Sequence, residues 1–255
     1  MRIVSCGITD VGMKRRRNED SYLIHDDIHL YVVADGMGGH AGGELASQIA
    51  VNSIDEVIFS TREEYDPSGP NSSWSSFETI MQEKLKYAVR LGGKRIHERA
   101  QLEPELHGMG TTAVVLLLKA NKAFVGHVGD SRVYLIRDGE ISQITEDHSL
   151  VNEQIKAGLI TPEAAKNFKY KNIITRSLGY QEEVEVDTQV MEVTRGDYFL
   201  LCSDGLTGLV EDDELLEMLM TMPFQVASKR MIELACERGG DDNITVAIAR
   251  IDALG

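Results

Sequence analysis

Carboxylates stand at or beside the ends of apolar, strand-like runs in five places along this chain. Three runs end in an aspartate, at Asp35, Asp130 and Asp204, and the first of these is followed by glycines at 36, 38 and 39. Two further stretches add acids near either end of the chain, Asn18-Glu19-Asp20 and Gly240-Asp241-Asp242-Asn243. Because buried strands read as short apolar runs, each carboxylate is expected at the rim of a core. The glycines allow the backbone to turn sharply and to approach a ligand closely.

Carboxylates gathered in this way would repel one another, and would repel an anionic substrate, unless cations lay among them. Oxygen ligands without matching His or Cys select hard ions such as Mg²⁺, Mn²⁺ or Ca²⁺. Two such ions can activate a water and clamp a phosphoryl group in line. A single Asp-Gly pair is also a common turn, so the alternative is a set of unrelated turn aspartates. The recurrence at five places favours the metal site.

The same motifs resemble those of the metal-dependent protein phosphatases of type 2C, and the bacterial branch, with Met37 after the first Asp-Gly, is the closer match. The motifs run in the family's order over almost the whole chain: Gly12-Met13-Lys14-Arg15, Asn18-Glu19-Asp20, Asp35-Gly36-Met37-Gly38-Gly39, Gly110-Thr111-Thr112, Gly129-Asp130-Ser131-Arg132, Ser203-Asp204-Gly205 and Gly240-Asp241-Asp242-Asn243. The resemblance implies hydrolysis of phosphoserine and phosphothreonine in proteins, with two tightly held Mn²⁺ or Mg²⁺ ions as cofactors.

The resemblance also implies a ligand set for the two ions. Asp35 would bridge them, and the Gly36 carbonyl would bind one. Asp204 and Asp242 would hold the first ion, while Glu19 approaches the second. A water shared by two dications loses a proton near neutral pH and attacks phosphorus directly, so no covalent phosphoenzyme is needed.

Two further acids have less direct roles in this reading. Asp20 is expected to orient metal-bound waters. Asp130 matches a residue that joins the Asp204 position at a third, weaker metal site in bacterial relatives. The alternative for Asp130 is a turn residue that caps Ser131 or pairs with Arg132.

One arginine of the basic segment 14–17 is expected to bind phosphate. A guanidinium can grip a phosphate through two parallel hydrogen bonds. The family places its arginine four residues before the Glu, which matches Arg15 before Glu19, whereas Arg16 and Arg17 are interpreted as solvated. The proton for the leaving alkoxide cannot come from the side chain after the first Asp-Gly, because Met37 stands where animal members have His. We expect a metal-bound water to supply it, with His40 structural.

Composition excludes several other classes of protein. The formal net charge of −15 argues against nucleic acid or an anionic membrane as the main partner. The three cysteines, Cys6, Cys202 and Cys236, show no CxxC spacing and indicate reduced thiols in a cytoplasmic protein. No apolar run is long enough to span a bilayer. His127, inside an apolar run, is interpreted as a core or sheet-face histidine rather than a ligand.

The elements that must position these residues alternate between helix pairs and strand runs. Strands are expected at 2–9, 21–24, 112–119, 123–128, 132–137, 140–144, 187–193, 197–203 and 243–251, besides the run that ends at Asp35. Helices are expected at 42–60, from Phe77 to Ile96 with an interruption at Gly92-Gly93, at 149–157, at 212–220 with Asp212 as N-cap, and at 224–238.

Helix pairs that bracket antiparallel strands predict an α+β protein, and the resemblance implies a four-layer αββα sandwich with two central antiparallel sheets. We expect one catalytic domain over residues 1–255. Within it, residues of about 146–180 match the family's flap, a small subdomain beside the active site. The flap departs from many bacterial members at Phe168-Lys169, where those carry His-Pro.

Three functions remain open at this point. The first is a protein phosphatase that acts as a monomer on phosphorylated proteins and opposes a bacterial Ser/Thr kinase. The second is a metal phosphoesterase for small phosphate esters. The third is a catalytically dead, phosphoprotein-binding scaffold of the same fold. The intact set Glu19, Asp35, Asp204 and Asp242 argues against the third, since a dead relative has no need to hold metals.

Overall fold

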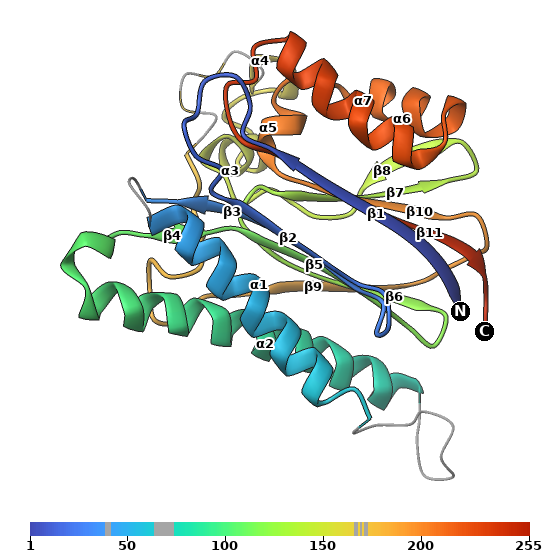
Figure 1. Cartoon of the computed structure of the whole chain (residues 1–255), viewed down its shortest axis with the longest axis horizontal. Helices are drawn as coiled ribbons and strands as arrows, with labels where there is room; N and C mark the ends of the chain where they lie inside the picture. The colour runs from blue at the N-terminus through green and yellow to red at the C-terminus, as the bar shows by residue number, and fades with distance from the viewer. Residues whose placement is uncertain (39–41, 64–73, 166–167, 169, 171–172) are drawn as a thin grey trace.

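Two antiparallel β-sheets lie face to face in the middle of the computed structural model (Figure 1). The structure describes residues 1–38, 42–63, 74–165, 168, 170 and 173–255. A five-stranded sheet has the order β1-β11-β10-β7-β8, with bounds Arg2–Asp10, Ile244–Ala253, Tyr198–Cys202, Arg132–Arg137 and Glu140–Gln143. A six-stranded sheet has the order β2-β3-β5-β6-β9, with bounds Asp20–His25, Leu30–Met37, Ala113–Lys119, Lys122–Val128 and Asp187–Glu192, and the short β4, Gly110–Thr111, pairs with β3.

Helices cover the outer face of each sheet. The six-stranded sheet is covered by α1, Gly42–Ser60, and α2, Trp74–Leu102, and the five-stranded sheet by α6, Asp212–Thr221, and α7, Phe224–Glu237 (Figure 1). The shorter α3, Leu150–Lys156, and α5, Asp204–Thr207, lie at the end of the sandwich opposite the two termini, and α4 and the 3-10 helix η1 span Pro162–Ala165 and Pro104–Leu106. The predicted four-layer αββα sandwich is therefore confirmed.

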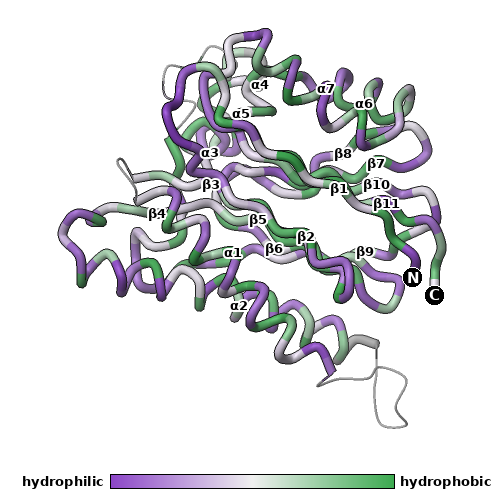
Figure 2. The backbone as a smooth tube through the Cα atoms, viewed as in Figure 1, coloured by the Kyte–Doolittle hydropathy of each residue, from purple (hydrophilic) through white to green (hydrophobic). Residues whose placement is uncertain are grey.

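Three layers of apolar side chains hold the sandwich together, because the central strands are buried on both faces. Val32 of β3 faces α1 and α2, whereas its neighbour Val33 faces the other sheet. Ile248 and Ala249 of β11 divide in the same way between α7 and the interior. Hydrophobic segments are accordingly concentrated in the central strands of the tube in Figure 2, while the covering helices alternate in hydropathy. Alternation along each strand assigns every second residue to the space between the sheets.

The predicted end of the strand that carries Asp35 was wrong. The strand does not end at Asp35 but continues to Met37, because Gly36 and Met37 pair with Thr111 and Gly110 of β4. Asp35 therefore stands inside a paired strand, where its backbone is held on both sides. Asp204 likewise is not the end of a strand, since β10 ends at Cys202 and Asp204 opens α5.

Two helix predictions also need correction. Gly92-Gly93 do not interrupt α2, which is continuous over 29 residues. A Cβ at Gly92 would lie 3.3 Å from the Cα of Ala50, so the glycine allows α1 and α2 to cross closely. The N-cap of α6 is Glu211 rather than Asp212, because Glu211 and Glu214 form a reciprocal capping box.

Two further observations limit the class of protein. Cys6, Cys202 and Cys236 are all free, and Cys202 is buried in β10. Among the residues that the structure describes, no helix is both long enough and apolar enough to cross a membrane.

Candidate active site

A cluster of carboxylates forms where strands of the two sheets end on the side of α3 and α5. Asp20 opens β2 and lies opposite Asp35 in the register of β3. Asp35 shares the face of Tyr31 and Val33, so its side chain lies between the sheets. The charges of Asp20, Asp204, Asp130 and Asp242 all act on the Asp35 carboxyl group. The fold thus gathers the predicted acids at one place.

The backbone of Asp35 is fixed by two threonines, Thr111 at the end of β4 and Thr112 directly after it. The Asp35 amide donates to Thr112 Oγ1 at 3.0 Å, and Thr111 Oγ1 donates to the Asp35 carbonyl at 2.8 Å. Thr112 Oγ1 also lies 2.7 Å from Ser131 Oγ, which ties the turn of Asp130 to the same strand. No role had been assigned to these threonines from the sequence, although they lie in the Gly110-Thr111-Thr112 motif.

Asn243 holds the loop that carries Glu19. The amide of Glu19 donates to Asn243 Oδ1 at 2.8 Å, and Asn243 Nδ2 donates to the carbonyls of Val11 and Arg17 at 3.0 and 2.9 Å. One buried side chain therefore fixes three points of the segment between β1 and β2. Asn243 had been noted only as part of a motif, and its clamp function depends on contacts more than 220 residues apart.

Arg15 reaches the cluster from the same loop. Its guanidinium donates to Asp242 Oδ2 at 2.6 Å, and the side chain stays 53% exposed. Lys14 forms an ion pair with Asp241 instead. Arg15 therefore combines a contact to the carboxylates with access to a ligand from solvent.

Gly36 of β3 and Gly43 at the start of α1 lie so close together that neither position has room for a side chain. A Cβ at Gly36 would lie 2.1 Å from the Gly43 carbonyl oxygen and 2.4 Å from that of Glu19. A Cβ at Gly43 would lie 2.6 Å from Glu19 Oε2. The two glycines allow the Glu19 carboxylate to approach the helix start.

The pKa values of the clustered carboxyl groups are raised. Burial, together with the charges of Asp20 and Asp204, raises the pKa of Asp35 well above its usual range. Burial raises the pKa of Asp20 to about 7 despite hydrogen bonds from Thr245 and Ser203, and burial with the charge of Asp204 raises the pKa of Asp130 to about 7. These groups hold a full negative charge at neutral pH only if cations compensate it.

Two buried carboxylate oxygens in the cluster have no hydrogen-bond partner, which also favours bound cations. Oδ2 of Asp20 accepts from Ser203 Oγ at 2.8 Å and from Thr245 Oγ1 at 2.6 Å, but Oδ1 is buried without a hydrogen-bond partner. Oδ1 of Asp130 is buried without a partner as well. Buried oxygens without a hydrogen-bond partner, among carboxyl groups whose pKa values are raised, fit a site for hard cations, because such cations prefer oxygen ligands.

Another group of possible ligands, His127, His148 and Asp187, has ligand atoms within 4.8 Å of one another. The two imidazole rings are stacked, with centroids 4.7 Å apart, so they lie face to face. Arg176 donates to Asp187 at 3.2 Å, and a guanidinium opposes a cation there. His148 Nδ1 accepts from the Gly129 amide at 3.1 Å, and Nε2 lies 3.0 Å from Asp187 Oδ2. This group is a structural hydrogen-bond network. His127 is its buried member, and its Nε2 lies 2.9 Å from the Glu146 carbonyl oxygen.

Several predicted positions lie outside the described residues. They include Gly39 of the first Asp-Gly motif, His40, which was expected to be structural, and Lys169 and its neighbours 166–167 and 171–172 in the expected flap. All the proposed ligands lie in the described part of the chain.

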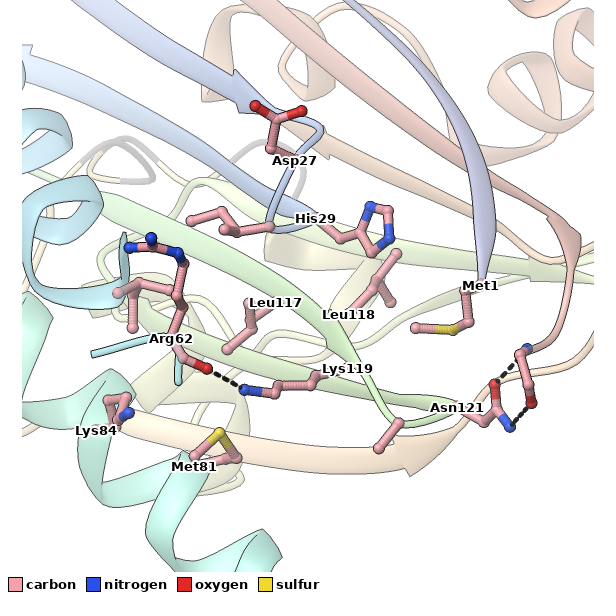
Figure 3. A pocket seen from close by; sticks show the side chains of 14 residues that line it. Met1, Asp27, His29, Arg62, Met81, Lys84, Leu117, Leu118, Lys119 and Asn121 are labelled. Atoms are coloured by element: carbon pink, nitrogen blue, oxygen red, sulfur yellow. Dashed lines mark hydrogen bonds between the residues drawn. The ribbon is translucent and has the colours of Figure 1, made fainter. Parts of the chain in front are cut away.

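Two cavities differ in the residues that line them. A cleft of about 780 Å³ opens beside the cluster and is lined by Asp130 and Asp204. A second cavity, of about 350 Å³, lies at the opposite end, beside Met1 (Figure 3). There Lys119 Nζ donates to the Arg62 carbonyl at 2.7 Å, and none of the clustered carboxylates lines the wall. Of the two cavities, only the first is lined by acids of the predicted metal site.

The comparisons with known proteins agree with this geometry. The family model described as protein phosphatase 2C matches residues 14–236, and the chain belongs to that family. The chain is 39% identical over 243 residues to the serine/threonine protein phosphatase PstP of Mycobacterium tuberculosis, covering 95% of this chain and 44% of PstP. It is 37% identical over 251 residues to the protein phosphatase PhpP of Streptococcus pneumoniae, covering 96% of both chains.

Solved structures share the fold over nearly the whole chain. The crystal structure of PstP from M. tuberculosis superposes with a TM-score of 0.87 at 38% identity and covers 98% of this chain and 99% of that one. A structure of the PstP catalytic domain in complex with two manganese ions gives a TM-score of 0.82 at 38% identity, with 97% of each chain covered. The chain thus spans less than half of full-length PstP but matches the solved part of it from end to end.

Proposed function

We propose that this chain hydrolyses phosphoserine and phosphothreonine esters in proteins with the help of two divalent cations, Mn²⁺ or Mg²⁺. The observation that carries the proposal is the cluster of buried carboxyl groups with raised pKa values. One oxygen each of Asp20 and Asp130 has no hydrogen-bond partner there, and Arg15 contacts the cluster through Asp242. A related catalytic domain with the same fold holds two manganese ions.

We propose that Asp35, Glu19, Asp204 and Asp242, with the Gly36 carbonyl, hold the two ions. Two cations bound there would lower the pKa of a water and would draw charge from the phosphoryl oxygens. Asp20 accepts hydrogen bonds from two hydroxyls with one oxygen and keeps the other for an ordered water. The threonines around β4 keep Asp35 in place, so that little reorganisation accompanies the reaction.

Arg15 is proposed to bind the phosphate. With the Asp242 charge shared by a cation, its guanidinium can exchange its present partner for phosphoryl oxygens, since the side chain is half exposed. The planar fork then orients the ester for attack from the metal side. Met37 cannot donate a proton to the leaving alkoxide, so we propose that a metal-bound water does so.

The test compares substrates with and without metal. A phosphothreonine peptide and a free nucleotide are offered to the chain at equal phosphate concentration, with Mn²⁺ and after exhaustive chelation. We expect peptide hydrolysis that depends on Mn²⁺ and exceeds nucleotide hydrolysis, and we expect the isosteric variant Asp35→Asn to be inactive. Preference for the nucleotide would favour the small-ester alternative, and metal binding without any turnover would favour the scaffold.

Asp130 is proposed to join Asp204 at a third, weaker ion. Its buried Oδ1 has no hydrogen-bond partner, and burial together with the charge of Asp204 raises the pKa of Asp130. A site with few protein ligands and several waters should bind loosely. We expect Asp130→Ala to keep the two tight ions and to lower peptide turnover, with loss of the low-affinity phase in a calorimetric Mn²⁺ titration. An unchanged weak phase together with unchanged turnover would make Asp130 an ordinary turn residue.

We further propose that residues 1–255 work as one catalytic domain, in which residues of about 146–180 act as a flap. Pairing of β1 with β11 supports the single domain, since it joins the two ends of the chain in one sheet. We propose that the chain acts as a monomer in the cytoplasm and opposes a bacterial Ser/Thr kinase, and the free cysteines fit that compartment. Sedimentation and dephosphorylation of a co-expressed kinase test these points.

A further inference from the structure

The cleft beside the carboxylate cluster extends well beyond the cluster itself. Its lining includes Asp130 and Asp204 together with the Glu146–Asp147 segment, residues of α3 and Glu211. Asp130 is only 7% exposed, so it contributes to the wall from a nearly buried position. A phosphoryl group at the cluster would therefore place the neighbouring residues of its peptide in this cleft.

The charge of the cleft is strongly one-sided. Arg132 is the only basic side chain in its wall among the described residues, and Asp147 binds that guanidinium with three hydrogen bonds of 2.7–3.2 Å. Glu146 and Glu211 are exposed acids in the same wall, and the Glu211 side chain also accepts a hydrogen bond from the Glu214 amide at the start of α6. The ion pair and hydrogen bond that Glu146 makes with Lys156 lower the pKa of Glu146, so this carboxylate is charged at neutral pH.

Glu146 Oε1 accepts a hydrogen bond from Asn152 Nδ2 at 3.2 Å, and its ion-pair partner, Lys156, can be exchanged. The distance between Lys156 Nζ and Glu146 Oε1 is 2.7 Å, but the two side chains are 59% and 52% exposed. Exposed pairs of this kind contribute only about 0–1 kcal/mol, because both charges remain in water. A cation on a bound peptide can therefore replace Lys156 at little cost.

Apolar side chains complete the cleft. Val151 and Ile155 lie one helical turn apart on α3, and Ile144 lies in the same wall, all three half-buried. Lysine and arginine lay their aliphatic stems along such surfaces and keep the charged end in water near an acid. An apolar wall with acids at its rim therefore fits a long basic side chain better than a short polar one.

We propose that this cleft is a specificity subsite that binds the peptide segment flanking the phosphorylated residue and selects segments carrying Lys or Arg. The inference rests on the proposed function, because it needs the phosphoryl group at the carboxylate cluster. Glu146 and Glu211 receive the basic ends, and Val151 and Ile155 pack on the stems.

The test uses two phosphothreonine peptides that differ only in two flanking residues, Lys in one and Gln in the other. We expect wild-type kcat/KM to be about tenfold higher for the Lys peptide at low ionic strength, with the difference shrinking as salt is added. In the double variant Glu146→Gln/Glu211→Gln the ratio should approach one. Gln keeps the size of both side chains and can still cap α6 at position 211.

A matched control and a fold check keep the result interpretable. Glu98→Gln removes an exposed acid from α2, on the far layer, and should leave the ratio unchanged. Thermal unfolding and calorimetric Mn²⁺ binding show whether the double variant remains folded and loaded. Equal hydrolysis of the two peptides by the wild type, or a ratio that survives in the double variant, overturns the subsite. Failure to hydrolyse either peptide would overturn the proposed function and the subsite with it.

Discussion

Among the carboxylates of the cluster, we expect Asp204 to be one of those on which the proposed activity depends most. Asp204 opens α5 and is in hydrogen-bond contact with Asp35, so its charge acts at the centre of the site. We expect Asp204→Ala to lose tightly bound metal and to lower kcat/KM by about a hundredfold or more, since several kcal/mol of charge stabilisation disappear. Metal content and phosphopeptide kinetics measure both effects.

The control for this variant is Asp213→Ala, which removes an exposed aspartate from the first turn of α6. It should retain wild-type metal content and rate. A rate in Asp204→Ala close to that of the control would show that the ligand assignment is wrong.

Arg15 should act mainly on binding. The dianionic phosphate is already present in the ground state, so most of its pairing with the guanidinium is uniform between substrate and transition state. We expect Arg15→Ala to raise KM for a phosphopeptide severalfold more than it lowers kcat, while Arg16→Ala has little effect. The reverse pattern between the two variants would move the phosphate-binding role to Arg16.

At the scale of elements, the contact between β3 and the start of α1 determines whether Glu19 can approach the cluster. Gly36→Ala would push a methyl group against the backbone carbonyls of Gly43 and Glu19, and backbone cannot move aside as a side chain can. We expect a loss of stability of about 2 kcal/mol or more, together with weaker metal binding. Chemical unfolding and a Mn²⁺ titration test this.

The matched control is Gly126→Ala in β6 of the same sheet. A Cβ at Gly126 would have its nearest neighbour at 3.8 Å, which is ordinary van der Waals distance. This variant should unfold close to the wild type. Equal stability of Gly36→Ala and Gly126→Ala would contradict the close approach.

At the scale of the whole molecule, metal binding and folding should be linked through the buried acids. The pKa of Asp20 is about 7 in the folded, metal-free chain and near its ordinary value after unfolding. A raised folded pKa contributes stability that is fully present below about pH 4 and is lost as the pH rises through about 7. The loss at pH 8 is on the order of 4 kcal/mol for this one group.

Asp20→Asn isolates this effect because the amide keeps an acceptor for Ser203 and Thr245 without the charge. In metal-free protein we expect the variant to be more stable than the wild type at pH 8 and similar to it at pH 4. Adding Mn²⁺ should stabilise the wild type more at pH 8 than at pH 5, since the ligands must be deprotonated. Parallel stability curves for the two proteins across this range would refute the linkage.

The local signals in the sequence were sufficient for most elements. Continuous apolar runs predicted the central strands because those strands are buried on both faces, and Asp138-Gly139 marked the hairpin between β7 and β8. Repeated carboxylates at the ends of such runs, with their glycines, predicted one acidic site for cations. A local signal for the α6 cap, Glu211 with Glu214, was present and was overlooked.

Only the tertiary structure decided the features that depend on partners distant in the chain. The continuation of β3 past Asp35 requires β4, and the continuity of α2 through Gly92 depends on its packing against Ala50. The hydrogen bonds of Asn243 join the end of the chain to the Glu19 loop, which no local pattern connects. After Val128 the chain crosses from one sheet to the other, and no local pattern predicts that crossing either. Apolar periodicity and turn residues act over a few positions, so they determine elements, whereas the geometry of a site is determined by which elements pack together.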